Sequence, residues 1–370
     1  MGKVLVTILV TCYNAEKFLE QFFDSVSKQT YRDYQLLILD DGSTDKSLSI
    51  CRAHAEKDSR IKVVANEHVG ITNIRNTILG MLDTEFAVSL DVDDYFEPDY
   101  LKHLMDAQKK YDADYVISNV IYVNQEGDET SRLTPRKEAF FTKEQLPDIL
   151  PELLEEDRLN YFYTKLYRTN LLKDIRVDPN IKYAEDTVIN MQYVLRINNL
   201  AVIENYDYRY VKYTTHSVTA NLGKELFWSL YKVNKYLCDL TEQNGLLNEK
   251  MQCAIDRRIL LSGTIALRRL GSSDENIETR LATAHKIINS DEYLQSYNRL
   301  KEKGQLETLN FDVIHPGEEE AFIQHVRQVS QEIKKRYTKK KILEHLPKPL
   351  FNAYHSIKKK TRTNSLTHPS

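Results

Sequence analysis

The first third of the chain alternates short apolar runs with longer segments of helical periodicity, and this pattern constrains the fold more than any other feature. Short runs rich in Val, Ile and Leu, separated by helices, are typical of a parallel sheet with crossover helices. The expected strands are Val4 to Val10, Gln35 to Leu39, Ile61 to Ala65, Phe86 to Leu90 and Tyr115 to Asn119. The expected helices are one from Phe18 to Val26 and others over 44–58, 71–82 and 98–111. The order predicts an α/β fold with a mostly parallel sheet.

The character of the sequence changes near residue 222. From there apolar residues repeat at helical spacing, as in Leu226 to Leu237 and Ile255 to Leu267, and a further periodic segment spans roughly 318–346. We therefore expect three parts: an α/β domain over 1–220, a helical C-terminal domain over 221–335, and a basic amphipathic tail over 336–370 with a disordered end.

Composition excludes several classes of protein. The 370 residues carry a net charge of -3 and are 41% hydrophobic, which suits buried cores and gives no overall positive field for nucleic acid. The four cysteines lack CxxC spacing, so we expect neither a zinc knuckle nor a disulfide framework. Scattered free cysteines fit a reducing compartment, so we expect a cytoplasmic location. No run of 18 apolar residues occurs, so no spanning helix is expected.

The tail is the one strongly basic segment. Residues 333–362 hold eleven Lys or Arg and one acid, Glu344, a local charge of +10, with apolar residues near one helical face. Basic residues are attracted to anionic lipid. We therefore expect residues 336–362 to hold the protein peripherally on the inner face of the cell membrane. A solvated basic tail is the alternative.

Acidic clusters follow the expected second and fourth strands, and a third lies later in the chain. They are Asp40-Asp41-Gly42-Ser43-Thr44-Asp45, Asp91-Val92-Asp93-Asp94 and Glu185-Asp186. Open α/β sheets bind ligands at the carboxyl ends of their strands, and parallel strands bring their ends to one rim. We expect the first two clusters to share one site.

Asp91-Val92-Asp93-Asp94 has the chemistry of a metal-diphosphate site. Mg²⁺ or Mn²⁺ usually takes one or two carboxylates together with phosphate oxygens and water. The alternative is a run of turn and cap residues before the next helix. Three carboxylates in four residues repel each other unless a cation or hydrogen-bond donors compensate, which favours metal. For the cluster at Asp40 the alternative is a strand-to-helix turn capped by Ser43 or Thr44.

Together with these acids, the segment from Val6 to Asn14, then Gly70 with Arg75-Asn76, and later Lys165-Leu166-Tyr167 resemble glycosyltransferase family 2. The resemblance covers roughly residues 1–220 and implies a GT-A fold that transfers a sugar from a nucleotide-sugar with inversion. Thr11-Cys12 and Val92 depart from the residues usual in that family. Trp228, the sole tryptophan, is outside any Gln-x-x-Arg-Trp motif, which favours transfer of single sugars over polymerisation.

The resemblance also implies roles for individual residues. Asp41 would contact the nucleotide base, Asp91 the ribose and Asp93 the metal, while Asp186 would be the catalytic base. Glu185 is the alternative base. A helix is expected to begin near Thr187, so capping of that helix is the structural alternative for Asp186. The remaining residues that the resemblance assigns to the nucleotide-sugar site are Thr11, Tyr13, Asn14 and Val92.

Two further residues are candidates with open alternatives. His216 resembles the segment that closes over the donor in relatives and is a candidate metal or phosphate ligand, although a lone His is more often a satisfied structural residue. Arg75 is a candidate phosphate or base contact, and a solvated helix charge is about as good an explanation.

The sequence thus predicts a metal-dependent transferase of a hexosyl or N-acetylhexosaminyl group. The expected donor is a UDP-sugar, through the family alone, and the expected acceptor is a lipid-linked or protein-linked glycan. A sugar nucleotidyltransferase is the nearest rival, but it needs a glycine-rich phosphate loop, and the chain has none. A non-catalytic membrane-docking or carbohydrate-binding protein of the same fold is the rival from another class.

Overall fold

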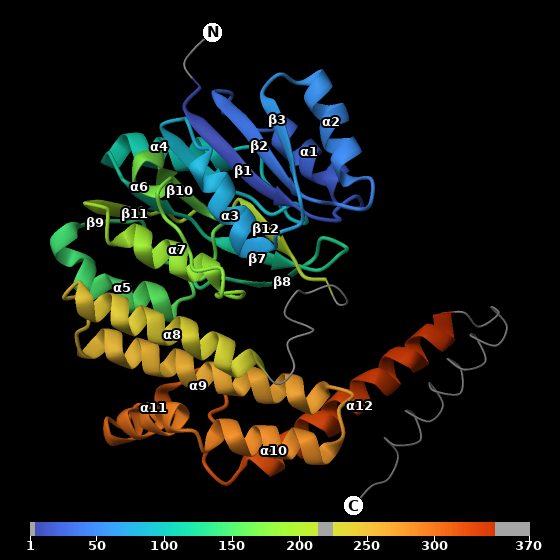
Figure 1. The fold of residues 1–370 in the computed structure, drawn as a ribbon, viewed down its shortest axis with the longest axis vertical. Helices are drawn as coiled ribbons and strands as arrows, with labels where there is room; N and C mark the ends of the chain where they lie inside the picture. Colours follow the sequence, from blue (N-terminus) through green and yellow to red (C-terminus); the bar gives the residue numbers. More distant parts are fainter. Residues whose placement is uncertain (1–3, 214–224, 345–370) are drawn as a thin grey trace, which may run out of the picture.

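The computed structural model describes residues 4–213 and 225–344, with side chains up to residue 331. An eight-stranded sheet in the order β3-β2-β1-β4-β10-β6-β11-β9 organises the N-terminal half (Figure 1). Its strands are β1 (Val6–Cys12), β2 (Tyr34–Asp41), β3 (Ile61–Asn66), β4 (Phe86–Ser89), β6 (Tyr115–Ile117), β9 (Ala139–Thr142), β10 (Lys165–Arg168) and β11 (Asn199–Val202). β10 and β9 pair antiparallel with their neighbours, and the other pairs are parallel, so the prediction of a mostly parallel sheet is confirmed.

A smaller sheet, which the sequence did not predict, lies beside the ends of the parallel strands. Its order is β5-β12-β7-β8, with bounds β5 (Tyr95–Phe96), β7 (Val120–Val123), β8 (Glu129–Arg132) and β12 (Tyr208–Val211). β5 directly follows the Asp91-Val92-Asp93-Asp94 cluster and pairs with β12. The small sheet therefore fixes the C-terminal end of this acidic loop.

Helices cover both faces of the large sheet because its strand residues alternate between two apolar cores. Ile8 and Val10 face α1, α2 and α4, whereas Leu9 faces α3, α5 and α7. The bounds are α1 (Leu19–Ser27), α2 (Ser47–Lys57), α3 (Ile71–Gly80), α4 (Tyr100–Tyr111), α5 (Leu146–Glu155), α6 (Thr169–Leu172) and α7 (Glu185–Val194). The four predicted helices and five predicted strands of the first third are all present, with ends shifted by a few residues.

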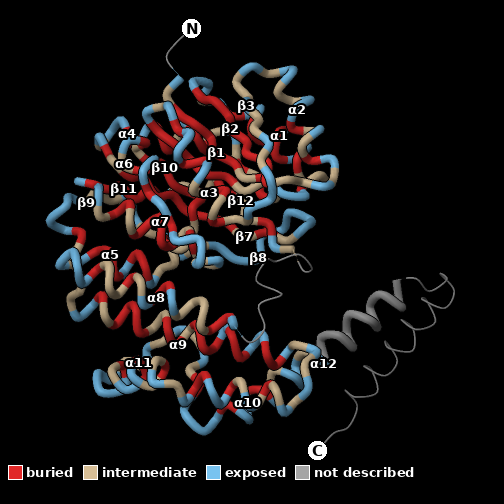
Figure 2. The backbone as a smooth tube through the Cα atoms, in the orientation of Figure 1, coloured by how far each residue is buried: buried red, intermediate tan, exposed pale blue. Residues whose placement is uncertain are grey.

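The C-terminal region is helical, as predicted, and it lies below the α5–α7 side of the sheet (Figure 1). Its helices are α8 (Leu226–Gln243), α9 (Glu249–Ser272), α10 (Ile277–Ile288), α11 (Asp291–Glu302) and α12 (Glu319–Glu344). Buried residues of α5 and α7 belong to the same apolar cluster as those of α8 to α11, and Figure 2 shows this buried layer running between the two regions. Among the helices that the structure describes, we find none with the length and hydropathy of a membrane-spanning segment.

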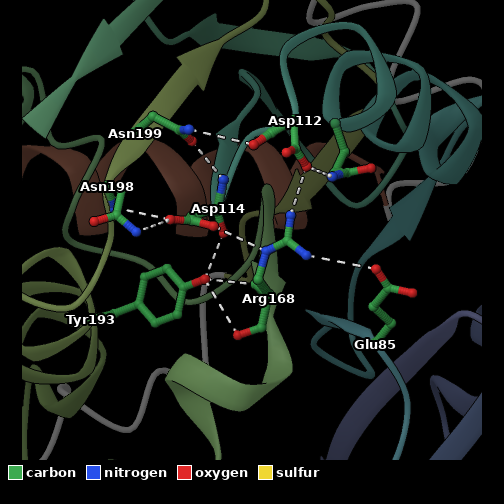
Figure 3. Close-up of polar contacts among 8 residues, drawn as sticks. Glu85, Asp112, Asp114, Arg168, Tyr193, Asn198 and Asn199 are labelled. Carbon is green, nitrogen blue, oxygen red and sulfur yellow. Dashed lines mark hydrogen bonds and ion pairs between the residues drawn. The ribbon is translucent and has the colours of Figure 1, made fainter.

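A polar network closes the rim opposite the acidic clusters (Figure 3). Arg168, at the end of β10, donates from Nε to Asp114 Oδ1 at 2.9 Å and pairs with Asp112 and Glu85. The Tyr193 hydroxyl of α7 donates to the Asp114 carbonyl at 2.6 Å. The network therefore ties α7 to the sheet at the end remote from the candidate site.

Candidate functional site

Arg75 brings together acids from two distant parts of the chain. From α3 its guanidinium lies 3.2 Å from Glu185 Oε1, 2.9 Å from Asp186 Oδ1 and 3.8 Å from Asp91 Oδ1. The Arg75 side chain is 8% exposed, so the alternative of a solvated helix charge is wrong. The end of β4 and the first turn of α7 thus meet around one buried cation.

Three carboxylates around one guanidinium leave this cluster with excess negative charge. Burial, with the nearby Asp186, raises the pKa of Glu185 to about 7. Burial also raises the pKa of Asp91 to about 7, against the opposing effect of Arg75. Burial alone would lower the pKa of Arg75, but the three carboxylates raise it overall. The cluster therefore favours binding of further positive charge.

Asp186 lies inside the first turn of α7 rather than at its cap. The helix begins at Glu185, two residues before the predicted start near Thr187, because Ala184 adopts a left-handed conformation (φ 55°) and turns the chain into the helix. No side-chain cap bond occurs at this end, so the capping alternative for Asp186 is wrong. Its Oδ2 instead accepts from the Phe162 amide at 3.2 Å, which fixes the carboxylate beside Arg75.

The Asp91 cluster divides into half-buried and buried acids. Asp94 is 2% exposed and accepts from the Tyr208 hydroxyl at 2.8 Å and the Val211 amide at 2.9 Å, so it anchors the loop to β12. Asp93 and Val92 are half-buried. The next helix begins at Tyr100 after Asp99, so these acids do not cap it.

Asp93 fits Mg²⁺ or Mn²⁺ as a partial ligand. Burial raises the pKa of Asp93, and a bound divalent cation would offset that cost. Within the described residues no group of three or more His, Cys, Asp or Glu could hold a metal by itself. Mg²⁺ commonly binds through one or two carboxylates together with phosphate oxygens, so Asp93 could share such an ion with a diphosphate. His216, the other predicted ligand, lies outside the described residues.

Asp41 and Tyr13 meet beside the loop after β3. The Asp41 carboxylate accepts from the amides of Val69 (2.8 Å) and Gly70 (3.0 Å) and lies 3.0 Å from His68 Nδ1. The His68 ring stacks on Tyr13 at 4.3 Å, and Tyr13 is 47% exposed. An accessible aromatic face thus lies next to a buried carboxylate.

Asn14 joins the first two strand-to-helix loops. Its Oδ1 accepts from the Thr44 amide at 2.8 Å, and its own amide donates to Ser43 Oγ. α2 begins only after Lys46, so neither Ser43 nor Thr44 caps it. Thr11 is half-buried within β1, opposite Leu39 of β2. Because β2 and β4 both pair in parallel with β1, the predicted meeting of the two acidic strand ends at one rim is confirmed.

Sequence reasoning missed two residues that shape this site. Tyr208 receives a hydrogen bond from the Asp91 amide (3.3 Å) while donating to Asp94, and Lys165 is 1% exposed at the start of β10. Tyr208 belongs to the second sheet, which was not predicted, and no sequence motif marked it as a site residue. Lys165 stood in a segment that matched the family, but its burial depends on the reversed direction of β10.

Comparisons with known proteins identify the family of the N-terminal domain and the fold. A family model described as Glycosyl transferase family 2 matches residues 7–176. The chain is 28% identical over 211 residues to glycosyltransferase GlyA of Streptococcus pneumoniae, covering 55% of this chain and 30% of GlyA. It is 29% identical over 191 residues to the uncharacterized glycosyltransferase EpsJ of Bacillus subtilis, covering 50% of this chain and 55% of EpsJ. The chain thus spans about half or less of these two relatives.

Staphylococcus aureus TarS is similar in both sequence and fold. TarS, a poly(ribitol-phosphate) beta-N-acetylglucosaminyltransferase, is 27% identical over 236 residues, covering 61% of this chain and 39% of TarS. The crystal structure of TarS 1–349 with UDP-GlcNAc superposes with a TM-score of 0.64 at 20% identity, covering 90% of this chain and 92% of that one. The large sheet and its covering helices have the fold of the GT-A glycosyltransferases, and the superposition on TarS covers most of the chain. Residues 7–176 therefore form a glycosyltransferase family 2 domain.

Proposed function

We propose that this protein is an inverting glycosyltransferase that moves one sugar from a nucleotide-sugar to an acceptor hydroxyl. One observation carries the proposal: the carboxylates of Asp91, Glu185 and Asp186 all lie around Arg75. The Asp91 loop and the start of α7 therefore meet at the edge of the sheet where α/β folds bind ligands. A single displacement at a sugar carbon needs acidic residues that hold the donor and, on another element, a base that activates the acceptor hydroxyl.

The chain's residues would divide the work. Tyr13, which stacks on His68, and Asp41 beside it would hold the nucleotide base, and Asp91 would contact the ribose. Asp93 would hold a divalent metal on the diphosphate, and that ion supplies Lewis-acid neutralisation of charge on the leaving nucleotide. Asp186 would take the proton from the acceptor hydroxyl as its oxygen attacks the anomeric carbon. Attack opposite the leaving group inverts that carbon.

The relatives support the substrate classes. TarS is named for transfer of N-acetylglucosamine to poly(ribitol-phosphate), and its structure was determined with UDP-GlcNAc. We therefore propose a UDP-sugar donor, with a hexosyl or N-acetylhexosaminyl group, and a surface-glycan precursor or glycoprotein acceptor. The proposed location is the cytoplasmic face of the membrane, held through residues 336–362, which lie outside the described side chains.

One experiment separates this proposal from its rivals. A panel of nucleotide-sugars is incubated with the purified protein and Mn²⁺, and release of nucleoside diphosphate is measured. A nucleotidyltransferase would instead release pyrophosphate from a nucleoside triphosphate and a sugar phosphate, and a binding protein would release nothing. UDP released from a single UDP-sugar supports the proposal.

The metal role is tested with Asp93→Ala. Because Asp93 is the proposed protein ligand of the ion, this variant should lose turnover while its circular dichroism spectrum stays unchanged. Exhaustive chelation of the wild-type protein should have the same effect, and Mn²⁺ should restore the activity. Full turnover in the variant or after chelation would contradict the metal role.

A further inference from the structure

A stack of tyrosine rings begins beside the residue that fixes Asp186. Tyr161 and Tyr163 stack with their ring centroids 4.8 Å apart and their planes 11° from parallel. Tyr163 stacks in turn on Tyr208 of β12, at 4.6 Å and 8°. Phe162, between the first two tyrosines, donates its amide to Asp186 Oδ2 at 3.2 Å. The stack therefore connects the segment that holds the proposed base with the small sheet.

The same rings reach the acidic loop and continue over the small sheet. The Tyr208 hydroxyl donates to Asp94 at 2.8 Å. Tyr210 lies on the same face of β12 as Tyr208, because side chains two residues apart on a strand share a face. Its ring centroid is 5.7 Å from that of Tyr163 and 5.6 Å from that of Tyr122, its partner in β7. Three of the rings are half-buried, and we call them the tyrosine platform: Tyr122, Tyr161 and Tyr210.

The segment that carries Tyr161 is held in place by hydrogen bonds from other elements. Asn190 of α7 donates to the carbonyls of Leu159 (2.9 Å) and Tyr161 (2.8 Å). Thr164 ends the segment in a left-handed conformation (φ 62°), and its carbonyl accepts from the Ser118 amide (2.9 Å) and hydroxyl (3.1 Å). Rings held in this way lose little freedom when a ligand binds, so the platform is preorganised.

The Tyr163 hydroxyl is a second sign of a ligand. Tyr163 is 3% exposed, and its hydroxyl has no hydrogen-bond partner among the residues that the structure describes. Buried hydroxyl groups are normally paired, because an unpaired one loses its bonds to water without replacement. A ligand rich in hydroxyl groups, seated on the neighbouring rings, would supply the missing partner.

The charges beside the platform favour a neutral ligand. The cluster around Arg75 has three carboxylates for one guanidinium and therefore carries excess negative charge. The cations that contact the platform's own segment are bonded to it: Lys165 donates to the Tyr163 carbonyl at 3.0 Å, and Arg258 of α9 donates to Asn160 Oδ1 at 2.5 Å. A phosphate-bearing acceptor would be repelled by the carboxylates, whereas a neutral sugar would not.

We propose that the tyrosine platform binds the terminal pyranose ring of a neutral glycan acceptor and directs one of its hydroxyl groups to Asp186. A pyranose has apolar C–H faces and a rim of hydroxyl groups, which matches tyrosine rings with their polar tips. The reacting hydroxyl must lie within hydrogen-bond reach of the base, and Tyr161 directly precedes the residue whose amide fixes that base. This inference deepens the proposed function and rests on Asp186 being the base.

The first test measures binding and needs no turnover. Methyl glycosides of glucose, galactose, N-acetylglucosamine and N-acetylgalactosamine are titrated into the full chain with UDP and Mg²⁺, and saturation-transfer NMR gives their dissociation constants. At least one glycoside should bind, and Tyr161→Leu and Tyr210→Leu should each weaken its binding by about fivefold or more. Tyr161→Phe keeps the ring and should bind as the wild type does.

Tyr231→Leu is the matched control, because Tyr231 is a half-buried tyrosine of α8 that stacks on Phe227. It should leave glycoside binding unchanged. Unchanged binding in both platform variants overturns the proposal, and so does a panel in which no glycoside binds. Binding of ribitol 5-phosphate in place of every glycoside also overturns it, because the site would then accept an anionic polyol. UDP binding should be equal in all variants, and its loss in the platform variants without loss of glycoside binding would assign the rings to the donor instead.

Turnover separates this inference from the proposed function. Release of UDP from a UDP-sugar by a protein without tyrosine-dependent glycoside binding would overturn the platform and leave the glycosyltransferase. Tyrosine-dependent binding in a protein that consumes no nucleotide-sugar would refute the proposed function and support the platform as a sugar-binding site. Circular dichroism checks the fold of each variant, and Tyr210→Leu carries the test if Tyr161→Leu does not fold. If neither folds while Tyr231→Leu does, the rings serve the core and the proposal is overturned.

Discussion

At the residue scale, the notable property of this site is that one guanidinium serves three carboxylates. Arg75 contacts Asp186 and Glu185 closely and Asp91 at longer range, so removal of any one acid changes the environment of the other two. The acids differ in their remaining contacts. Asp186 is additionally fixed by the Phe162 amide, whereas Glu185 is more buried and its pKa is raised to about 7.

Those differences predict that Asp186, rather than Glu185, is the base. Asp186→Asn keeps the side-chain shape but cannot accept the proton, so transfer to the acceptor should fall by roughly 10² or more. Donor binding should persist, since the Asp41 and Asp93 loops are unchanged. Measurement of kcat for transfer and of the dissociation constant for UDP checks both parts.

Glu185→Gln is the matched variant for this prediction. It removes a negative charge from the same cluster, and it should retain most of the transfer activity. A near wild-type rate in Asp186→Asn together with an inactive Glu185→Gln would reverse the assignment. Two active variants would place the base outside this pair.

The acids of the site were predictable from the sequence, whereas the environment of Arg75 was not. A carboxylate that follows a predicted strand can be placed from sequence, because the carboxyl ends of parallel strands lie at one edge of the sheet. An arginine on a helix looks the same in sequence whether it is solvated or buried. Arg75 is buried because the first turn of α7, far along the chain, brings two acids against its guanidinium.

At the element scale, the start of α7 determines where the proposed base lies. The sequence predicted a start near Thr187, but the left-handed Ala184 allows the helix to begin at Glu185. A left-handed alanine has no sequence signature, because glycine and asparagine are the residues usually found there. The second sheet was missed for a similar reason, since its short strands depend on pairing between β5 and β12 rather than on local pattern.

Ala184→Gly should stabilise the protein by about 1 kcal/mol, because the left-handed conformation costs alanine roughly that much and costs glycine little. Ala282→Gly is the matched control on an exposed position of α10, where glycine should destabilise by about 1 kcal/mol. Chemical denaturation of both variants provides the measurement. If both variants are less stable than the wild type, residue 184 does not adopt the left-handed conformation in solution.

The network around Arg168 should matter for stability and not for chemistry. Arg168→Leu removes the positively charged partner of the half-buried Asp114 and should cost about 1–3 kcal/mol of unfolding free energy. Arg132→Leu removes a pair with Glu129 in which both side chains are well exposed, and its effect should stay within about 0.5 kcal/mol. The KM for the donor should be unchanged in Arg168→Leu, because the network lies at the opposite rim. A raised KM in this variant alone would contradict that separation.

At the scale of the whole molecule, the two regions share a core. The change in periodicity near residue 222 predicted a helical C-terminal region, and α8 to α12 confirm that this region is helical. It did not predict that α5 and α7 pack into the same apolar cluster as α8 to α11. Periodicity shows which side of a helix is apolar and gives no information about which neighbour covers that side.

The basic tail gives a prediction for the intact chain. If residues 336–362 bind the membrane, a chain ending at residue 335 should sediment with anionic vesicles much less than the full chain, since each basic residue contributes up to about 1 kcal/mol. Neutral vesicles are the control and should bind neither form. Equal sedimentation of the two forms with anionic vesicles would show that the tail is not the anchor.

The shared core also bears on how such a protein could change during evolution. A domain joined by a linker can be exchanged or lost without harm to its neighbour, but here the C-terminal helices share one apolar cluster with α5, α7 and the sheet that carries the site. Substitutions on the buried sides of α5 and α9 must therefore be compatible with each other. The sheet and its helices are inherited as one unit, and new specificity would have to arise in the loops at the rim.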